Sequence, residues 1–192
     1  LLIKEDILMF DSIISNKISE YKFYFYPEIR KIDENENSIN LPEDYEERRI
    51  KGENDSYLCE IIRNDDIENF VIHYNRNHFQ LSTQIESSIY ETNSFLKNKV
   101  LTLIEYSVFF GSIQIIRFLF QNNVVLKPSL WIYAIHSNNP EIIHFLEENG
   151  IRPDDLSYKE CLKESIKCHH LDFASYFKDN FIHDDTKVIG CA

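Results

Sequence analysis

The side chains that are best suited to bind a metal lie close together near the C-terminal end of the sequence. They are Cys161, Cys168, His169 and His170. Thiolates and imidazoles are the preferred ligands of Zn²⁺, and a structural zinc site needs four of them arranged as a tetrahedron around the ion. The two cysteines are seven residues apart on one expected helix, whereas the histidines fall on a turn and just after it. We therefore expect no metal here, and a metal or thiol enzyme around Cys161 to His170 is the least favoured of three functional hypotheses.

A second group of possible ligands matches part of a calcium-binding loop. Asp33, Asn35, Asn37 and Asp44 stand at positions 1, 3, 5 and 12 of the loop pattern. Ser38 occupies the position where the sharp turn requires glycine. We therefore interpret residues 31–55 as an acidic polar linker, which is either a solvated segment or a polar helix.

Motifs for nucleophilic catalysis or phosphate binding are missing from the sequence. It contains no G-x-S-x-G motif, no known cysteine and histidine signature, and only four glycines from which to build a phosphate loop. We expect a protein without enzymatic activity and without a cofactor.

Charge and hydrophobicity restrict the class of partner. The chain carries 20 Lys and Arg against 32 Asp and Glu, a net charge of -12, which disfavours nucleic acid and anionic membranes as partners. Its 43% hydrophobic residues are typical of a folded protein. No apolar run reaches the ~20 residues that a membrane-spanning helix needs.

The first residues, LLIKEDILMF, lack the basic region and cleavage site of a secretory signal. We therefore expect reduced thiols and a cytoplasmic protein, with association with the cytoskeleton as an open alternative. Because the sequence does not begin with Met, we expect a piece of a longer chain.

Four segments share one spacing around a turn. The turn positions are Asp65, Gly111, Asn138 and His169. Hydroxyl residues suited to a helix N-cap precede each turn, at Ser56, Thr102, Ser129 and Ser157. Apolar residues seven and three positions before each turn share one helical face: Leu58 and Ile62, Ile104 and Val108, Trp131 and Ile135, Leu162 and Ile166. A second apolar stripe follows each turn, so every segment predicts a short helix, a tight turn and a longer helix.

This pattern resembles the ankyrin repeat, whose core reads T-P-L-H-x-A-A-x-x-G-H-x-x-V-V-x-x-L-L-x-x-G-A. The second segment provides Thr102, Ile104, Ser107, Val108, Gly111, Ile115, Ile116, Phe118, Leu119, Asn123 and Val124 at the matching places. Leu103 and Glu105 replace the Pro and His of the pattern, and the second and third turns are 27 residues apart where an ankyrin unit has about 33. The resemblance implies an all-α, ankyrin-type helix-turn-helix solenoid with shortened connections.

The chain also resembles, over roughly residues 50 to 185, a large ankyrin-type family of trichomonad protists that is classed as a domain of unknown function. The resemblance lies in the strings GENDSYLCEIIRNDDIENFV, SIYETNSFL, TLIEYSVFFGSIQII, PSLWIYAIHSNNPEIIHFLEEN and YKECLKESIKCHH. It implies the fold and no activity.

The repeats predict the organisation of the whole chain. We expect repeats at about 56–79, 102–126, 129–153 and 157–183, with an insertion at 80–101 that has a helical turn around Ile85 to Phe95. An apolar stripe at residues 3–18 predicts an N-terminal helical extension, within residues 1–30, that caps the stack or ends an upstream helical region. Residues 184–192 are expected to be a tail.

Six residues on the first helices are candidates for contact with a partner: Tyr106, Phe109, Phe110, Tyr133, His136 and Ser137. In an ankyrin-type hairpin they lie on the side away from the second helix, where aromatic side chains can anchor a protein. The alternative is that Phe109 and Phe110 pack between repeats, because large apolar residues are usually buried.

Two functional hypotheses take precedence over the enzyme. The first is a scaffold that binds a protein partner of unknown identity. The acidic charge of the chain would attract basic patches on that partner. The second is a structural subunit of a larger stable assembly, such as a cytoskeletal one.

Overall fold

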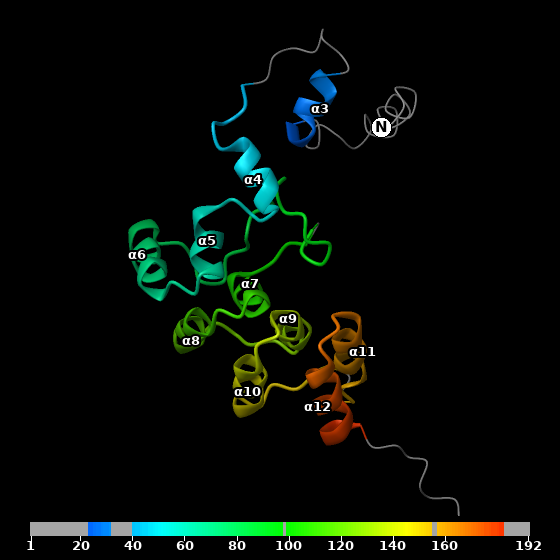
Figure 1. Cartoon of the computed structure of the whole chain (residues 1–192). Coiled ribbons are helices and arrows are strands. Elements are labelled where there is room, and N and C mark those ends of the chain that lie inside the picture. The colour runs from blue at the N-terminus through cyan, green and yellow to red at the C-terminus, as the bar shows by residue number, and fades with distance from the viewer. Residues whose placement is uncertain (1–22, 32–39, 98, 155–156, 183–192) are drawn as a thin grey trace, which may run out of the picture. The chain divides into compact units, whose positions relative to one another are not determined.

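The computed structural model describes residues 23–31, 40–97, 99–154 and 157–182 (Figure 1). Within these ranges the regular elements are all helices, which confirms the all-α prediction. The chain divides into two compact units: Leu1–Ser56 with Ser87–Lys99, and Tyr57–Glu86 with Val100–Ala192. The predicted helix at residues 3–18, the calcium-like positions Asp33 to Asn37 and the tail lie outside the described residues.

The first unit contains α3 (Tyr26–Arg30) and α4 (Tyr45–Lys51). The second contains four helix pairs: α5 (Tyr57–Arg63) with α6 (Ile67–Asn77), α7 (Leu103–Phe110) with α8 (Ile113–Gln121), α9 (Leu130–Ser137) with α10 (Pro140–Glu148), and α11 (Lys159–Lys167) with α12 (Leu171–Phe181). We call these pairs hairpins one to four. The longest of the described helices have 11 residues, too few to cross a membrane.

The turn inside each hairpin has a left-handed residue. The φ angles are 49° at Asp65, 79° at Gly111, 51° at Asn138 and 59° at His169. Aspartate, asparagine and glycine tolerate this region better than other residues, because they lack bulk at Cβ or bond to the local backbone. The turns therefore lie at the positions that the repeat spacing indicates.

The hydroxyl residues before the first helices differ in what they do. Thr102 forms a full capping box with Glu105, since its side chain accepts from the Glu105 N–H and its own N–H donates to the glutamate. Ser129 precedes α9 without a side-chain capping bond. In the fourth hairpin the cap position is Tyr158, and Ser157 accepts a bond from the Lys159 N–H instead.

The hairpins pack through their first helices. In Figure 1, α7 lies beside α9, which also contacts α11, and α5 contacts α7. The apolar residue three positions before the turn is fully buried in the first three hairpins, at Ile62, Val108 and Ile135. In the fourth hairpin the equivalent Ile166 is 53% exposed. Each first helix therefore covers the one before it, and the described residues place no helix over the outer side of α11.

A second set of contacts joins each hairpin to the one before it. Ser112, directly after the second turn, donates a hydrogen bond to the carbonyl oxygen of Ile62. His170, directly after the fourth turn, has Nδ1 2.8 Å from the carbonyl oxygen of Ile135. Asn139, directly after the third turn, donates to the carbonyl oxygen of Gly111 at 3.3 Å. The first residue after a turn thus satisfies a backbone acceptor of the preceding hairpin.

The insertion at 80–101 has a different structure from the one expected. Its described residues contain no helix, and the helical turn predicted around Ile85 to Phe95 is limited to 93–97, where the Lys97 N–H donates to the carbonyl oxygen of Asn93 at 2.8 Å. Part of it, Ser87–Lys99, belongs to the first unit. Thr92 there donates through its N–H and hydroxyl to the carbonyl oxygen of Gly52, at 3.0 and 2.9 Å.

The segment interpreted as a linker contains α4. Tyr45 at its start is buried and lies edge-on to Tyr90, with 6.1 Å between the ring centroids. Gly52 ends the helix in a left-handed conformation, φ 63°. Residues 45–51 are therefore a helix within the first unit, with Tyr45 as its buried residue.

Candidate functional site

Two of the six candidate partner-contact residues are buried in the second unit. Tyr106 is 1% exposed and Phe109 is 8% exposed. The Tyr106 hydroxyl accepts a hydrogen bond of 2.8 Å from the Arg63 guanidinium in the preceding hairpin. Both side chains therefore contribute to packing between hairpins and have little surface left for a partner.

Phe110 lies at the edge of this packing and is only partly buried. Its ring is 4.6 Å from that of Tyr106 and 5.0 Å from that of Phe109, and the Arg63 guanidinium carbon is 5.9 Å from its centroid. An arginine near an aromatic face is a common arrangement in binding surfaces. Phe110 and Arg63 together offer an apolar and cationic contact surface.

The three candidates on α9 are all partly buried. Burial and the nearby charge of Glu105 raise the pKa of Tyr133, which places its phenol close to α7. His136 stacks on Phe109 with a centroid distance of 5.3 Å. Ser137 donates to the carbonyl oxygen of Ala134 within its own helix, so its hydroxyl supports the helix end. Tyr133 and His136 are thus the α9 side chains that lie along the junction with α7.

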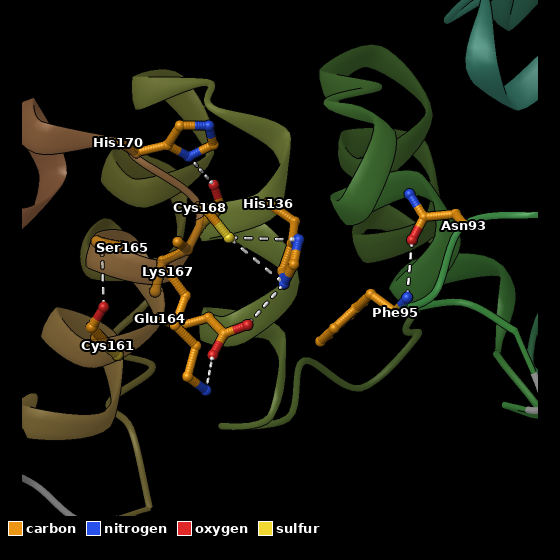
Figure 2. A network of polar contacts seen from close by, with 10 residues as sticks. Asn93, Phe95, His136, Cys161, Glu164, Ser165, Lys167, Cys168 and His170 are labelled. Carbon is orange, nitrogen blue, oxygen red and sulfur yellow. Dashed lines mark hydrogen bonds and ion pairs between the residues drawn. The ribbon is translucent and has the colours of Figure 1, made fainter.

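His136 also belongs to a polar cluster between α9 and α11 (Figure 2). Its Nε2 is 3.0 Å from Oε1 of Glu164, and the Cys168 sulfur is 3.6 Å from Nδ1 and 3.8 Å from Nε2. The other carboxylate oxygen of Glu164 accepts from Lys167 at 2.8 Å. We call His136, Glu164 and Cys168 the His-Glu-Cys cluster.

The charges in this cluster follow from its surroundings. Burial opposes ionisation of Glu164, but the hydrogen bonds from Lys167 and His136 outweigh it and hold the pKa of the carboxyl below its usual value. Burial, followed by the charge of Glu164, raises the pKa of the Cys168 thiol. The cluster therefore combines a carboxylate with a protonated thiol.

The geometry does not favour Cys168 as a nucleophile activated by His136. A sulfur atom almost equidistant from both ring nitrogens cannot lie along the lone pair of either one, so the imidazole is poorly placed to accept the thiol proton. Catalytic thiols also have lowered pKa values, whereas the pKa of Cys168 is raised. What the cluster does present is three different ligand types within 4.8 Å of one another.

The other members of the sequence cluster point elsewhere. Cys161 is fully buried, the His169 side chain is exposed on the turn, and His170 is held by the Ile135 carbonyl group. Cys168 is thus the member that meets two further ligands, His136 and Glu164. The repeat alignment contains a signal for this contact, because adjacent first helices bring α9 and α11 together, whereas the spacing of cysteines and histidines in the sequence reports on one hairpin alone.

A groove of about 580 Å³ lies elsewhere in the second unit. Its lining includes the ring of Tyr74, the aliphatic side chains of Val124 and Leu130 and the carboxyl group of Glu105. No cluster of metal ligands or nucleophiles lies among its described lining residues. The groove therefore has the lining and volume to take up an apolar side chain of a ligand.

Comparisons of the chain with family models, curated proteins and solved structures find no match. The geometry and the residue chemistry are thus the basis for a functional proposal.

Proposed function

We propose that the chain is a cytoplasmic protein-interaction module, an ankyrin-type helical repeat that binds another protein without a catalytic step. The observation that carries this proposal is the row of first helices, in which α7 lies between α5 and α9. Packed first helices in successive hairpins create a continuous surface, which is the type of surface that repeat proteins use for binding.

Residues along that surface have the chemistry of a contact site. Phe110 and Tyr133 are partly buried aromatic side chains, and Arg63 lies over the Phe110 ring. Tyrosine, arginine and other large side chains of this kind account for much of the affinity at protein interfaces. We take Arg63, Phe110 and Tyr133 as the contact residues, and Tyr106 and Phe109 as the packing that supports them.

Charge supports a protein partner with a basic surface. The net charge of -12 attracts positively charged surfaces and accelerates their association at low ionic strength. Salt should therefore slow the association more than it speeds the dissociation.

Site-specific photo-crosslinking tests the proposal. A photoreactive phenylalanine analogue at position 110 or 133 should crosslink one defined protein in native lysate. The same analogue at the exposed Gln121, at the end of α8, serves as the matched control and should not crosslink it. Phe110→Ala should then weaken binding of the purified partner by about tenfold. Equal crosslinking from all three positions, or none from any, would contradict the proposal.

A second candidate is a structural subunit of a stable assembly, and two exposed apolar side chains of hairpin four favour it. Ile166 is 53% exposed and Leu171 is 68% exposed. Large apolar residues gathered on one face often mark a surface covered in an assembly. Size-exclusion chromatography of the native protein distinguishes the two functions: a permanent complex favours the subunit, and a monomer that binds its partner reversibly favours the module.

A further inference from the structure

We propose that the His-Glu-Cys cluster binds a single Zn²⁺ ion through the imidazole of His136, Oε1 of Glu164 and the thiolate of Cys168. The cluster shares no member with the proposed contact residues Arg63, Phe110 and Tyr133, and it adjoins them through His136, which stacks on Phe109. Its three ligand types, thiolate, imidazole and carboxylate, are those found in zinc sites of proteins.

The separations between the ligand atoms fit a tetrahedral ion. Zinc bonds of about 2.1 Å to nitrogen or oxygen and about 2.3 Å to sulfur give tetrahedral edges of about 3.4 Å between N and O and about 3.6 Å between N and S. In the structure the N to O separation is 3.0 Å, and the sulfur is 3.6 and 3.8 Å from the two ring nitrogens. These two kinds of separation therefore need to change by only a few tenths of an ångström, and the Glu164 oxygen lies within 4.8 Å of the Cys168 sulfur.

Binding of the ion would require a larger change in the orientation of the imidazole than in the distances between the ligand atoms. In the structure the Cys168 sulfur lies along neither nitrogen lone pair, so the imidazole must turn for Nε2 and the sulfur to face the same ion. The torsion about the Cβ–Cγ bond of histidine has broad energy wells, so the torsion itself opposes this turn little. The turn would also alter the stacking of the ring on Phe109. On binding, the thiol proton is released to solvent as the zinc to sulfur bond forms.

The surroundings permit entry of an ion. The side chains of His136 and Glu164 are 17% and 14% exposed, so the cluster is neither open to bulk solvent nor sealed from it. Lys167 binds Oε2 of Glu164 and leaves Oε1 directed at the imidazole. Three protein ligands leave a fourth position for water, as in zinc sites that are not closed by a fourth side chain.

The helices explain why the ligands meet. Glu164 and Cys168 are four residues apart on α11 and at its cap, which places them on the same face. His136 comes from the last turn of α9, and the two helices contact each other. Binding of an ion here would fasten hairpin three to hairpin four.

The test is metal titration of the chelator-treated full chain, followed by calorimetry with Zn²⁺ and by absorption with Co²⁺. We expect one ion per chain and, with Co²⁺, a near-ultraviolet thiolate-to-metal band. Cys168→Ser should abolish the band, and Glu164→Gln and His136→Gln should each lower Zn²⁺ affinity by at least about tenfold. An excess of Mg²⁺ should leave the cobalt spectrum unchanged, because hard cations avoid thiolate ligands.

Cys161→Ser is the matched control, because this cysteine lies on the same helix and should not bind the ion. Fluorescence of Trp131, fully buried in α9, verifies that each variant is folded. If Cys168→Ser does not fold, His136→Gln carries the test. A folded chain that shows no thiolate band, keeps the band in Cys168→Ser, or loses it only in another cysteine variant would overturn the proposal.

Discussion

Ser112 and Ile62, fifty positions apart, are joined by a hydrogen bond from the serine hydroxyl to the isoleucine carbonyl oxygen, and the serine side chain is buried. The bond connects the second hairpin to the first at a point that water does not reach. Its removal would leave a buried backbone acceptor without that donor.

The Ile62 carbonyl oxygen also accepts from the Asp65 N–H at 3.0 Å, so Ser112→Ala removes one of its two hydrogen bonds and should lower the free energy of unfolding by about 0.5 to 1.5 kcal/mol. Ser129→Ala is the control, because that serine is exposed and makes no capping bond, and its effect should stay within about 0.5 kcal/mol. Urea unfolding followed by Trp131 fluorescence measures both. Similar losses in the two variants would show that the bond between hairpins contributes nothing specific.

Gly111 tests the turn of the second hairpin. A Cβ at this position would lie 3.6 Å from Asn139 Nδ2, an ordinary contact, so the expected cost arises from its φ of 79°. Gly111→Ala should destabilise the second unit by about 1 to 2 kcal/mol, and Gly111→Val by more. Asn138→Gly, at φ 51° in the next turn, should be neutral or stabilising. Thermal melts with equal and negligible shifts would contradict the role of the turn.

Asp65 combines a left-handed conformation with a capping role in the neighbouring hairpin. Its carboxylate accepts from the N–H groups of Gln114 and Ile115 in the first turn of α8, each at 3.1 Å. Asp65→Gly permits the left-handed conformation but removes the capping carboxylate. Asp65→Asn also permits that conformation and retains an acceptor oxygen for the cap. We expect Asp65→Gly to cost about 1 kcal/mol and Asp65→Asn clearly less. The reverse order in urea unfolding would exclude the cap as a source of stability.

The phenol of Tyr176 should ionise at a higher pH than an ordinary tyrosine. Burial, followed by its hydrogen bond of 2.6 Å to Glu147, raises the pKa of this phenol from 10.0 to about 12. Because the folded pKa lies above the ordinary value, the stabilisation is fully present below about pH 10 and is lost as the pH rises towards 12. Tyr176→Phe should remove one phenolate from the last part of the tyrosine absorbance titration. Loss of the phenolate from the main part of the curve, near pH 10, would contradict the contact between α10 and α12.

The left-handed turns and the buried apolar stripes could be predicted from the sequence, because each depends on residues that are close together in the chain. A left-handed residue at Gly111 or Asn138 and an apolar stripe such as Ile104 with Val108 are visible within one hairpin. The junction of Ser87–Lys99 with α4 was not, since Thr92 meets Gly52 across forty positions and neither residue has a distinctive pattern.

The His-Glu-Cys cluster shows the same limit for a site. Cys168 is recognisable in the sequence as a possible metal ligand. Its spacing suggests the adjacent His169 and His170 as the other ligands. His136 and Glu164 are ordinary surface residues of their own helices until α9 and α11 come together, and the distances between them depend on side-chain torsions that a repeat alignment does not contain.

The bonds from Ser112, Asn139 and His170 to the preceding hairpin have a consequence for how such a chain can change over time. Three side chains of different size and charge perform one task, and what they share is a polar hydrogen within reach of a main-chain oxygen. This position therefore requires a hydrogen-bond donor and tolerates a change of residue type within the chain. Two hairpins can keep this contact with few identical residues between them. Similarity among such units is therefore better judged from the positions of donors and acceptors than from sequence identity.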